Sequence, residues 1–466
     1  MSNLLRWCII IGITCNDFRA KAFQADNKFF AKFSGAKKQD FGLVVIHMTL
    51  RIFDEIIIYT FLLRGCSPFI NRRVISSSLS FLIRLGKRVV RDSKHLTKLR
   101  PFMTQCSDFI EKNDANYVPL SPVSFLTRTA RAFPNAQAVA YGHIRYDYKT
   151  ALARCSSLAR ALIQVGIQAG DVVSVMAPNI PEVFESHFGV PMTGGVLNAI
   201  NTRLDAATVG FILEHAEAKV FIFDSALGPV VDEALKHVSQ KPYLVQIVDQ
   251  VAGESIYGES LDYEAFLNSA DETTPLHICS DEWDSIALNY TSGTTGNPKG
   301  VLYHHRGAYM NALGNILTWD MPKKPRYLWT LPMFHCNGWC FPWAITERAG
   351  VHVCLRQISG ENIMNTIADE GVTHMCGAPI IMQMMLDEVD KGRVRHTHEV
   401  AMMTAAAPPP AAVLGKMKHA GFAITHVYGL TEIYGPAVVC EWQAEWEHLD
   451  IEEQASLMAR QGLNYS

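Results

Sequence analysis

The chain has 466 residues, of which 48% are hydrophobic and 19% charged, and its formal net charge is −3. This composition is typical of a globular protein and excludes a disordered or fibrous polypeptide, while the near-neutral charge gives no reason to expect a nucleic-acid partner. The length allows two or three domains. The eleven cysteines are scattered, which indicates neither a disulfide framework nor a zinc site and favours a reducing compartment.

Charge divides the chain into a basic segment and an acidic body. Residues 1–102 carry 18 Lys and Arg against 6 Asp and Glu, whereas 103–466 carry 24 against 39. We interpret 1–102 as a basic extension that is poorly ordered or mispredicted and dispensable for the fold, with Met103 as an alternative start. Other readings of this segment are a targeting arm, or a membrane span over 41–63 that three central charges disfavour. We expect no membrane association.

From about residue 150, helical and strand patterns alternate. A helical stripe over 151–166 precedes an apolar strand over 171–178. Further helices are predicted over 207–218 and 230–238, and further strands over 219–224, 243–249, 285–290, 326–332, 352–355, 373–379, 400–406 and 423–429. Strands that are apolar throughout and alternate with helices predict an α/β fold of parallel sheets covered by helices on both faces.

Unusual residues follow four of these strands. The segments are "TSGTTGNPKG" at 291–300, "MFHCNGW" at 333–339, "AAAP" at 405–408 and "YGLTE" at 428–432. Ligands of open parallel sheets bind beyond the carboxyl ends of the strands. We therefore expect these four segments to meet at one rim and form the functional site.

The 291–300 loop has the chemistry of a polyphosphate site. Glycines let backbone N–H groups approach an anion, hydroxyls donate further hydrogen bonds, and Lys299 supplies positive charge. The loop is not a Walker A motif, because Lys299 is followed by Gly300 rather than Ser or Thr. Composition alone would also fit an ordinary surface turn.

Three other residues are candidates for roles beside such a phosphate. The Tyr428 ring can stack on a purine, and a carboxylate at Glu432 would suit a magnesium ion next to a triphosphate. His335 could act as a general base. Taken one at a time, an exposed glutamate and a structural histidine are the commoner explanations.

Together the four segments resemble the signatures of the adenylate-forming enzymes, which include acyl-CoA synthetases, luciferases and the adenylation domains of peptide synthetases. "YTSGTTGNPKG" is similar to the phosphate loop of that family, and "YGLTE" to its adenine and magnesium segment. "PMFHCNGW" and "TAAAPPPA" are similar to its acyl-pocket and adenine segments, and "HCNGW" points toward fatty-acyl and short- or medium-chain acyl-CoA synthetases. The resemblance covers about 115–466 and implies the large domain of such an enzyme.

The resemblance implies a two-step reaction. A carboxylate, expected to be that of a fatty acid, attacks the α-phosphate of ATP to give acyl-AMP and pyrophosphate, and coenzyme A then displaces AMP. The resemblance also implies the residue roles. The phosphates would lie against Thr291, Ser292, Gly293, Thr294, Thr295 and Lys299, and the adenine against Tyr428, Ala406, Ala407 and Pro408. Thr431 would contact the α-phosphate, Glu432 with Thr291 would hold Mg²⁺, and the acyl site would be lined by His335, Trp339 and Ala405.

In that family a ribose-binding aspartate and a mobile C-terminal domain with a catalytic lysine follow the "YGLTE" segment, and neither occurs in the 34 residues after Glu432. We interpret 103–466 as a truncated large domain and expect little turnover unless another cation, such as Lys323 or Lys324, replaces the lysine. The alternatives are a non-catalytic nucleotide-binding remnant and, with less support, a luciferase-like oxygenase. The cytoplasm is the first expected compartment, with mitochondrion and peroxisome as alternatives.

Overall fold

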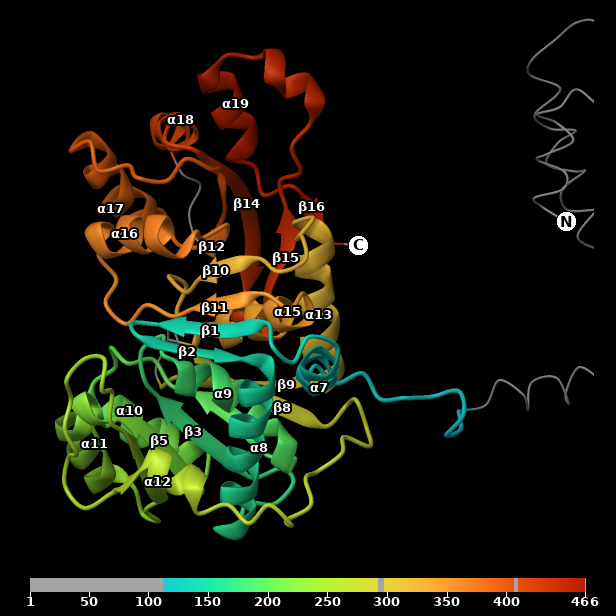
Figure 1. Ribbon diagram of the computed structural model, residues 1–466, viewed down its shortest axis with the longest axis vertical. Coiled ribbons are helices and arrows are strands. Elements are labelled where there is room, and N and C mark those ends of the chain that lie inside the picture. Colours follow the sequence, from blue (N-terminus) through green and yellow to red (C-terminus); the bar gives the residue numbers. More distant parts are fainter. Residues whose placement is uncertain (1–111, 292–296, 406–409, 466) are drawn as a thin grey trace, which may run out of the picture. The chain divides into compact units, whose positions relative to one another are not determined.

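The computed structural model describes residues 112–291, 297–405 and 410–465. The predictions for 1–102, including the 41–63 stretch, lie outside these residues. Within them, two β-sheets and the helices around them form the body of the chain (Figure 1).

The first sheet has seven strands in the order β7-β6-β5-β3-β4-β8-β9. Its strands are β3 (Val172–Met176), β4 (Val196–Ala199), β5 (Val220–Asp224), β6 (Tyr243–Ile247), β7 (Leu261–Asp262), β8 (Ser285–Thr291) and β9 (Lys299–His304). All neighbours are parallel except β8 and β9, which form an antiparallel pair.

The second sheet has nine strands in the order β16-β15-β14-β13-β12-β10-β11-β1-β2. Its strands are β1 (Gln137–Tyr141), β2 (Ile144–Asp147), β10 (Arg326–Leu328), β11 (Val351–Val353), β12 (His374–Cys376), β13 (Val400–Thr404), β14 (Phe422–Leu430), β15 (Gly435–Val439) and β16 (Leu463–Asn464). The centre of the sheet is parallel, whereas β2, β15 and β16 pair antiparallel at its margins.

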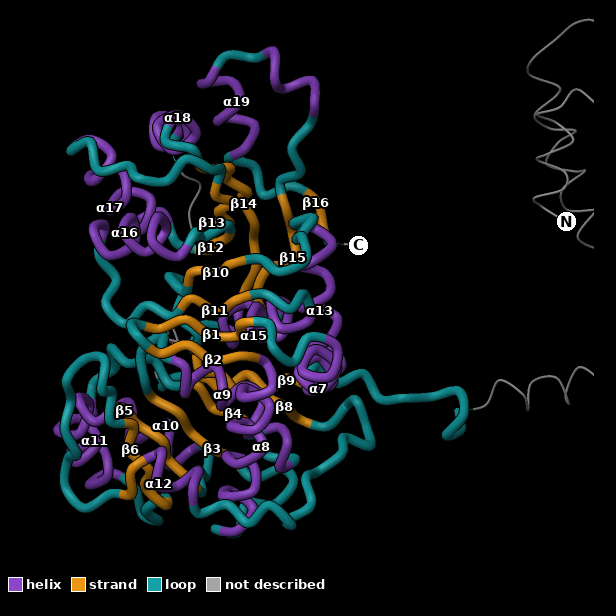
Figure 2. Tube along the Cα trace, in the orientation of Figure 1, coloured by secondary structure: helices purple, strands orange, loops and turns teal. Residues whose placement is uncertain are grey.

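Helices cover both faces of each sheet, which confirms the α/β prediction (Figure 2). One core cluster joins the two sheets through α7 (Val123–Ala132), α8 (Tyr148–Gln164), α9 (Pro181–Gly189), α12 (Tyr263–Asn268), α13 (His305–Thr318) and α15 (Phe341–Glu347). A second cluster packs α16 (Gly360–Glu370), α17 (Pro379–Asp390) and α18 (Ala411–His419) on the nine-stranded sheet. A third packs α10 (Ala206–His215) and α11 (Gly228–Ala234) on the seven-stranded sheet.

Short segments complete the described body: α14 (Cys336–Trp339), α19 (Ile451–Met458), and the 3₁₀ turns η1 (Pro191–Thr193), η2 (Ser225–Leu227), η3 (Leu235–His237), η4 (Thr431–Ile433) and η5 (Ala444–His448).

No helix of the described part is long and apolar enough to cross a bilayer. Local signals fix several helix starts: the Asp147 carboxylate caps α8 by accepting from the Thr150 N–H at 2.8 Å, and Ser359 caps α16 in the same way.

Candidate active site

A cavity of about 390 Å³ brings together three residues that the sequence singled out. Thr291 ends β8, His335 follows β10, and Thr431 follows β14. The remaining lining residues are Asn198, Ala199, Ile200, Asn201, Leu204, Thr208, Ile212, Tyr290, Pro298 and Phe334. Hydroxyls, amides and an imidazole therefore share one cavity with apolar side chains, which is the usual make-up of a small-molecule site.

The expected single rim is formed by two sheets. β8 belongs to the seven-stranded sheet, whereas β10, β13 and β14 belong to the nine-stranded sheet. The sequence pattern could not show this, because strand order depends on contacts between distant segments. The side chain of Asn289 links the two sheets by donating from Nδ2 to the Phe334 carbonyl at 2.7 Å.

The phosphate-loop candidate forms the connection of a β-hairpin. Thr291 on β8 lies opposite Lys299 on β9, and Lys299 is exposed. Ser292, Gly293, Thr294 and Thr295 lie outside the described residues. The hairpin register thus places the Thr291 hydroxyl and the Lys299 cation, both predicted to contact phosphate, on directly opposed residues of β8 and β9.

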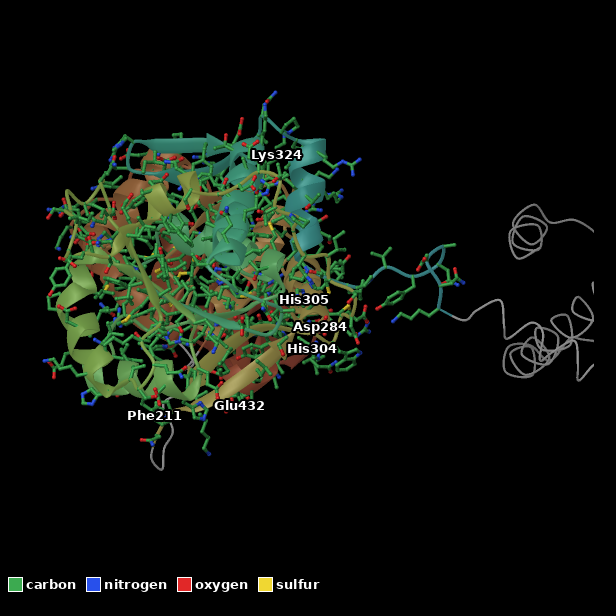
Figure 3. The ribbon with its side chains drawn as sticks, turned by 90° about the horizontal axis from the view of Figure 1, so that it is seen from below. Phe211, Asp284, His304, His305, Lys324 and Glu432 are labelled. Carbon is green, nitrogen blue, oxygen red and sulfur yellow. The ribbon has the colours of Figure 1, made fainter. Side chains whose placement is uncertain are left out.

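Helix α10 contributes Thr208 and Ile212 to the cavity wall. The Tyr290 hydroxyl lies 2.7 Å from Nδ1 of His215, whose ring stacks on Phe211 with a centroid distance of 5.4 Å. Figure 3 labels Phe211 and Glu432 on the same side of the molecule. These contacts fix the β8 end of the cavity against α10.

The segment after His335 has an unusual backbone. Cys336, Asn337, Gly338, Trp339 and Cys340 all have positive φ, between +46° and +64°. They form one turn of left-handed helix, which costs L residues roughly 1–2 kcal/mol each. Such a turn persists only where its surroundings determine it.

Contacts from other elements hold this left-handed turn. Asn315 of α13 donates from Nδ2 to the Trp339 carbonyl at 2.7 Å, and Asn337 is fully buried. A Cβ on Gly338 would lie 2.6 Å from the Trp329 ring, so glycine is needed there for space as well as for φ. Trp339 is half-buried and is not among the residues that line the cavity.

The His335 side chain is neutral at physiological pH. Its side chain is exposed on the cavity wall, but surrounding protein still desolvates the ring, and this lowers its pKa, with the charge of Arg203 as the second cause. A neutral imidazole can accept one hydrogen bond and donate another. His335 is therefore suited to contact a carboxylate or a proton-bearing group in the cavity.

The 428–432 segment differs from the predicted loop. β14 continues to Leu430, so Tyr428 lies inside a strand and pairs with Val438 of β15. The predicted strand over 423–429 is therefore confirmed. The expectation that Tyr428 follows this strand is wrong, because antiparallel pairing with β15 keeps the chain in β14 as far as Leu430. Thr431 and Glu432 begin the η4 turn, and Glu432 is exposed.

Of the remaining candidates, Ala405 and Lys324 lie within the described residues. Ala405 is buried at the end of β13, while Ala406, Ala407 and Pro408 lie outside the described residues. Lys324 lies far from Glu432 in Figure 3, and its ammonium is 5.7 Å from the Phe133 ring centroid. Lys324 therefore lies away from the segment that carries Thr431 and Glu432.

No cluster of three or more His, Cys, Asp or Glu side chains suited to a metal ion occurs within residues 112–291, 297–405 and 410–465. A magnesium site would thus rest on Glu432 and Thr291 together with oxygens of the bound substrate. This is the usual arrangement for Mg²⁺ beside a triphosphate.

Sequence reasoning missed the β4 and α10 side of the cavity. Asn198 is fully buried on β4; its Nδ2 donates to Ser174 at 2.9 Å, while its Oδ1 has no partner within the protein. A polar residue within the apolar run "GVLNAI" was the available signal. An unpaired buried acceptor of this kind is costly unless water or a ligand satisfies it.

Comparison with known proteins identifies the family. The family described as "AMP-binding enzyme" matches residues 126–462. Acetate/butyrate–CoA ligase AAE7, peroxisomal, of Arabidopsis thaliana is 43% identical over 372 residues, or 77% of this chain and 65% of that protein. Trans-cinnamate:CoA ligase, peroxisomal, of Petunia hybrida is 41% identical over the same shares of the two chains.

A solved structure shares the fold of this chain. The crystal structure of the N-terminal domain of FACL13 from Mycobacterium tuberculosis superimposes with a TM-score of 0.62 at 24% identity, covering 74% of this chain and 82% of that one. The chain belongs to the AMP-binding enzyme family, and its relatives are named as CoA ligases. The matched segment spans less than two thirds of the length of those two relatives.

Proposed function

We propose that this protein activates a carboxylic acid with ATP and transfers the acyl group to coenzyme A. The observation that carries the proposal is the cavity shared by Thr291, His335 and Thr431, which come from three segments far apart in the chain. The names of the relatives support the same chemistry. We also retain the proposal that 103–466 constitute the large domain of such an enzyme.

In the first step a carboxylate oxygen attacks the α-phosphorus of ATP, and the bond to the leaving pyrophosphate breaks. Thr291 and Thr431 have hydroxyls that can donate to phosphoryl oxygens, and Lys299 can neutralise negative charge at the end of the hairpin loop. Tyr428, Ala406, Ala407 and Pro408 are proposed for the adenine. In the second step the sulfur of coenzyme A attacks the acyl carbonyl, and AMP leaves.

His335 is proposed to orient the reacting carboxylate. The neutral imidazole can donate a hydrogen bond to a carboxylate oxygen without holding the substrate in a salt bridge. Trp339 and Ala405 are proposed to lie beside the acyl group. Catalysis of this kind works chiefly by placing the reactants and stabilising developing charge.

Glu432 and Thr291 supply the oxygen donors that Mg²⁺ prefers, and we propose them as its protein ligands. The exposed Glu432 carboxylate directly follows Thr431 and would otherwise repel a polyphosphate. When bound, the ion would neutralise phosphate charge. Glu432 would contribute a carboxylate ligand and Thr291 a hydroxyl to its shell.

The proposed substrate is a small aliphatic or aromatic carboxylic acid. Acetate, butyrate and trans-cinnamate appear in the names of the two relatives. The proposed substrate is therefore smaller than the long-chain fatty acid that the sequence pattern also allowed. A panel of acetate, butyrate, trans-cinnamate and palmitate in a pyrophosphate-exchange assay on the full chain tests the choice. Exchange strongest with palmitate would contradict it.

Calorimetry with Mg²⁺-ATP tests nucleotide binding by the full chain. Glu432→Ala should weaken binding in Mg²⁺ by about tenfold and leave binding in EDTA nearly unchanged. The control is Glu272→Ala, an exposed glutamate in the connection between α12 and β8. If ATP binds with equal affinity with and without Mg²⁺, Glu432 does not act as a magnesium ligand. Little exchange is also expected of an isolated large domain, so the discriminating variant is a fusion to the C-terminal domain of a related CoA ligase. Binding without any exchange even in that fusion would favour the alternative of a non-catalytic nucleotide-binding protein.

The peroxisome is the compartment to test first. Both relatives carry "peroxisomal" in their names, whereas the sequence pattern had favoured the cytoplasm. A fluorescent fusion imaged with a peroxisomal marker distinguishes the two. Uniform cytoplasmic fluorescence would support the earlier expectation.

A further inference from the structure

Two tyrosines stack next to the cavity without lining it. Tyr303 and Tyr434 have ring centroids 3.6 Å apart and an interplanar angle of 8°. Both are buried, with 7% and 4% of their surface exposed. Nothing in the proposed chemistry uses either residue.

Tyr303 connects the phosphate hairpin to the Thr431 segment. It lies on β9, the strand that returns from the loop between Thr291 and Lys299. Its hydroxyl donates to the Thr431 carbonyl at 2.6 Å. The same carbonyl accepts from the Tyr434 N–H at 3.1 Å, so the two tyrosines hold Thr431 together.

Tyr434 connects the Thr431 segment to the left-handed turn. Its hydroxyl donates to Oδ1 of Asn337 at 3.1 Å, and its carbonyl accepts from Nδ2 of Asn311 on α13 at 2.8 Å. The next residue, Gly435, is so close to the turn that a Cβ there would lie 3.3 Å from the Trp339 Cα. The turn is thus held from outside by the segment that carries Thr431.

We propose that the stacked pair Tyr303–Tyr434 consists of positioning residues that hold Thr431 and the turn after His335 in register with the phosphate hairpin. The proposal rests on the proposed function, because it assigns the pair to the adenylation site. Three segments deliver the residues of that site, and each is joined to the next through one tyrosine side chain. Sites that need reacting groups in fixed geometry depend on such supporting contacts.

The first test removes only the Tyr303 hydroxyl. Tyr303→Phe keeps the ring stack and deletes the bond to Thr431. The matched control is Tyr148→Phe, because Tyr148 is fully buried and its hydroxyl also donates to a backbone carbonyl, that of Gly350, at 2.6 Å. Calorimetry of the full chain with butyryl sulfamoyl-adenosine, a non-hydrolysable analogue of butyryl-AMP, should show binding five- to twentyfold weaker in Tyr303→Phe and within twofold of the parent in Tyr148→Phe.

A double-mutant cycle separates positioning from general destabilisation. If Tyr303 acts through Thr431, adding Tyr303→Phe to Thr431→Ala should weaken binding by less than twofold. Additive losses, or equal losses in the Tyr148→Phe control, would overturn the proposal.

Amide hydrogen exchange gives a second readout that needs no ligand. Tyr303→Phe should speed exchange in the segment around Thr431, and Tyr434→Phe should speed it in the turn after His335. Tyr148→Phe should change neither. Unchanged exchange in both tyrosine variants would overturn the proposal. If exchange responds as expected but the parent chain does not bind the analogue, the positioning role stands and the proposed function fails.

Discussion

At the scale of single residues, buried histidines couple the fold to pH. His352 is fully buried; its Nδ1 accepts from the Trp329 indole N–H at 3.2 Å, and its Nε2 lies 3.1 Å from the Thr346 hydroxyl. That hydroxyl donates to the Pro342 carbonyl at 2.7 Å, which leaves it to accept from Nε2–H. Burial, with the charge of His187 as a second cause, lowers the pKa of His352 to about 3.

The sign of the pH effect follows from this pKa. The folded pKa lies below the unfolded value of about 6.5, so the stability is fully present above pH 6.5 and is lost as pH falls toward 3. At pH 5 the loss from this one histidine is roughly 2 kcal/mol. His352→Gln should lower stability at pH 7 but reduce the further loss between pH 7 and pH 5 by about that amount. Urea unfolding at the two pH values measures it, with the exposed His448→Gln as control. An unchanged pH slope would show that His352 is not a source of the acid sensitivity.

The left-handed turn makes Gly338 a second critical residue. Gly338→Ala would place a methyl group 2.6 Å from the buried Trp329 ring at a φ of +55°. Gly371 at the end of α16 has a similar φ of +60°, but a Cβ there would meet nothing within 4 Å. Gly371→Ala should cost about 1 kcal/mol from backbone strain alone. Gly338→Ala should cost roughly 1–3 kcal/mol more because the site is overpacked. Equal losses of unfolding free energy in Gly338→Ala and Gly371→Ala would mean that the Trp329 ring shifts to make room for the methyl group.

At the scale of elements, Asn179 joins the end of β3 to the segment that follows β10. Its Nδ2 donates to the carbonyls of Trp329 at 2.8 Å and Leu331 at 3.0 Å, and its Oδ1 accepts from the Met333 N–H at 2.9 Å. Asn179→Ala deletes three buried hydrogen bonds and should cost roughly 2–4 kcal/mol. The control Asn362→Ala deletes one exposed bond, to the Gln357 carbonyl, and should stay within about 0.5 kcal/mol. Similar unfolding curves for both variants would contradict this role for Asn179.

The elements that the sequence predicted are those with a strong local pattern. The apolar run over 219–224 is β5, and the run over 285–290 lies within β8. The strand β4 was not predicted because Asn198 interrupts its apolar run. The strand β9 was not predicted because it is the second strand of a β-hairpin and lacks the continuous apolar run of a buried parallel strand. That Thr291, His335 and Thr431 line one cavity could be expected, because residues at the ends of parallel strands meet at one edge of a sheet. The Tyr303–Tyr434 stack could not be predicted, because it depends on contacts across more than a hundred residues.

At the scale of the whole described body, one arginine links the two sheets. Arg356 follows β11 of the nine-stranded sheet and donates to Asp224 at the end of β5 at 2.6 and 2.9 Å. It also donates to Asp249 at 3.0 Å and contacts Glu254, both in the segment after β6. Tyr141 at the end of β1 donates to Asp249 as well. Three carboxylates of the seven-stranded sheet therefore meet one cation of the other sheet.

Removing that cation should weaken the whole body rather than one element. Arg356→Met keeps much of the side-chain volume but leaves Asp224 and Asp249, which are at most 5% exposed, beside Glu254 without their arginine. Breaking a buried ion pair from one side costs roughly 3–5 kcal/mol, because the remaining charges lack compensation. The control Arg128→Met removes an ion pair with Glu347 at 3.5 Å in which the arginine side chain is 60% exposed, and should cost at most about 1 kcal/mol. Urea unfolding followed by tryptophan fluorescence measures both variants. A loss for Arg356→Met no larger than that of the control would show that this ion-pair cluster contributes little to holding the two sheets together.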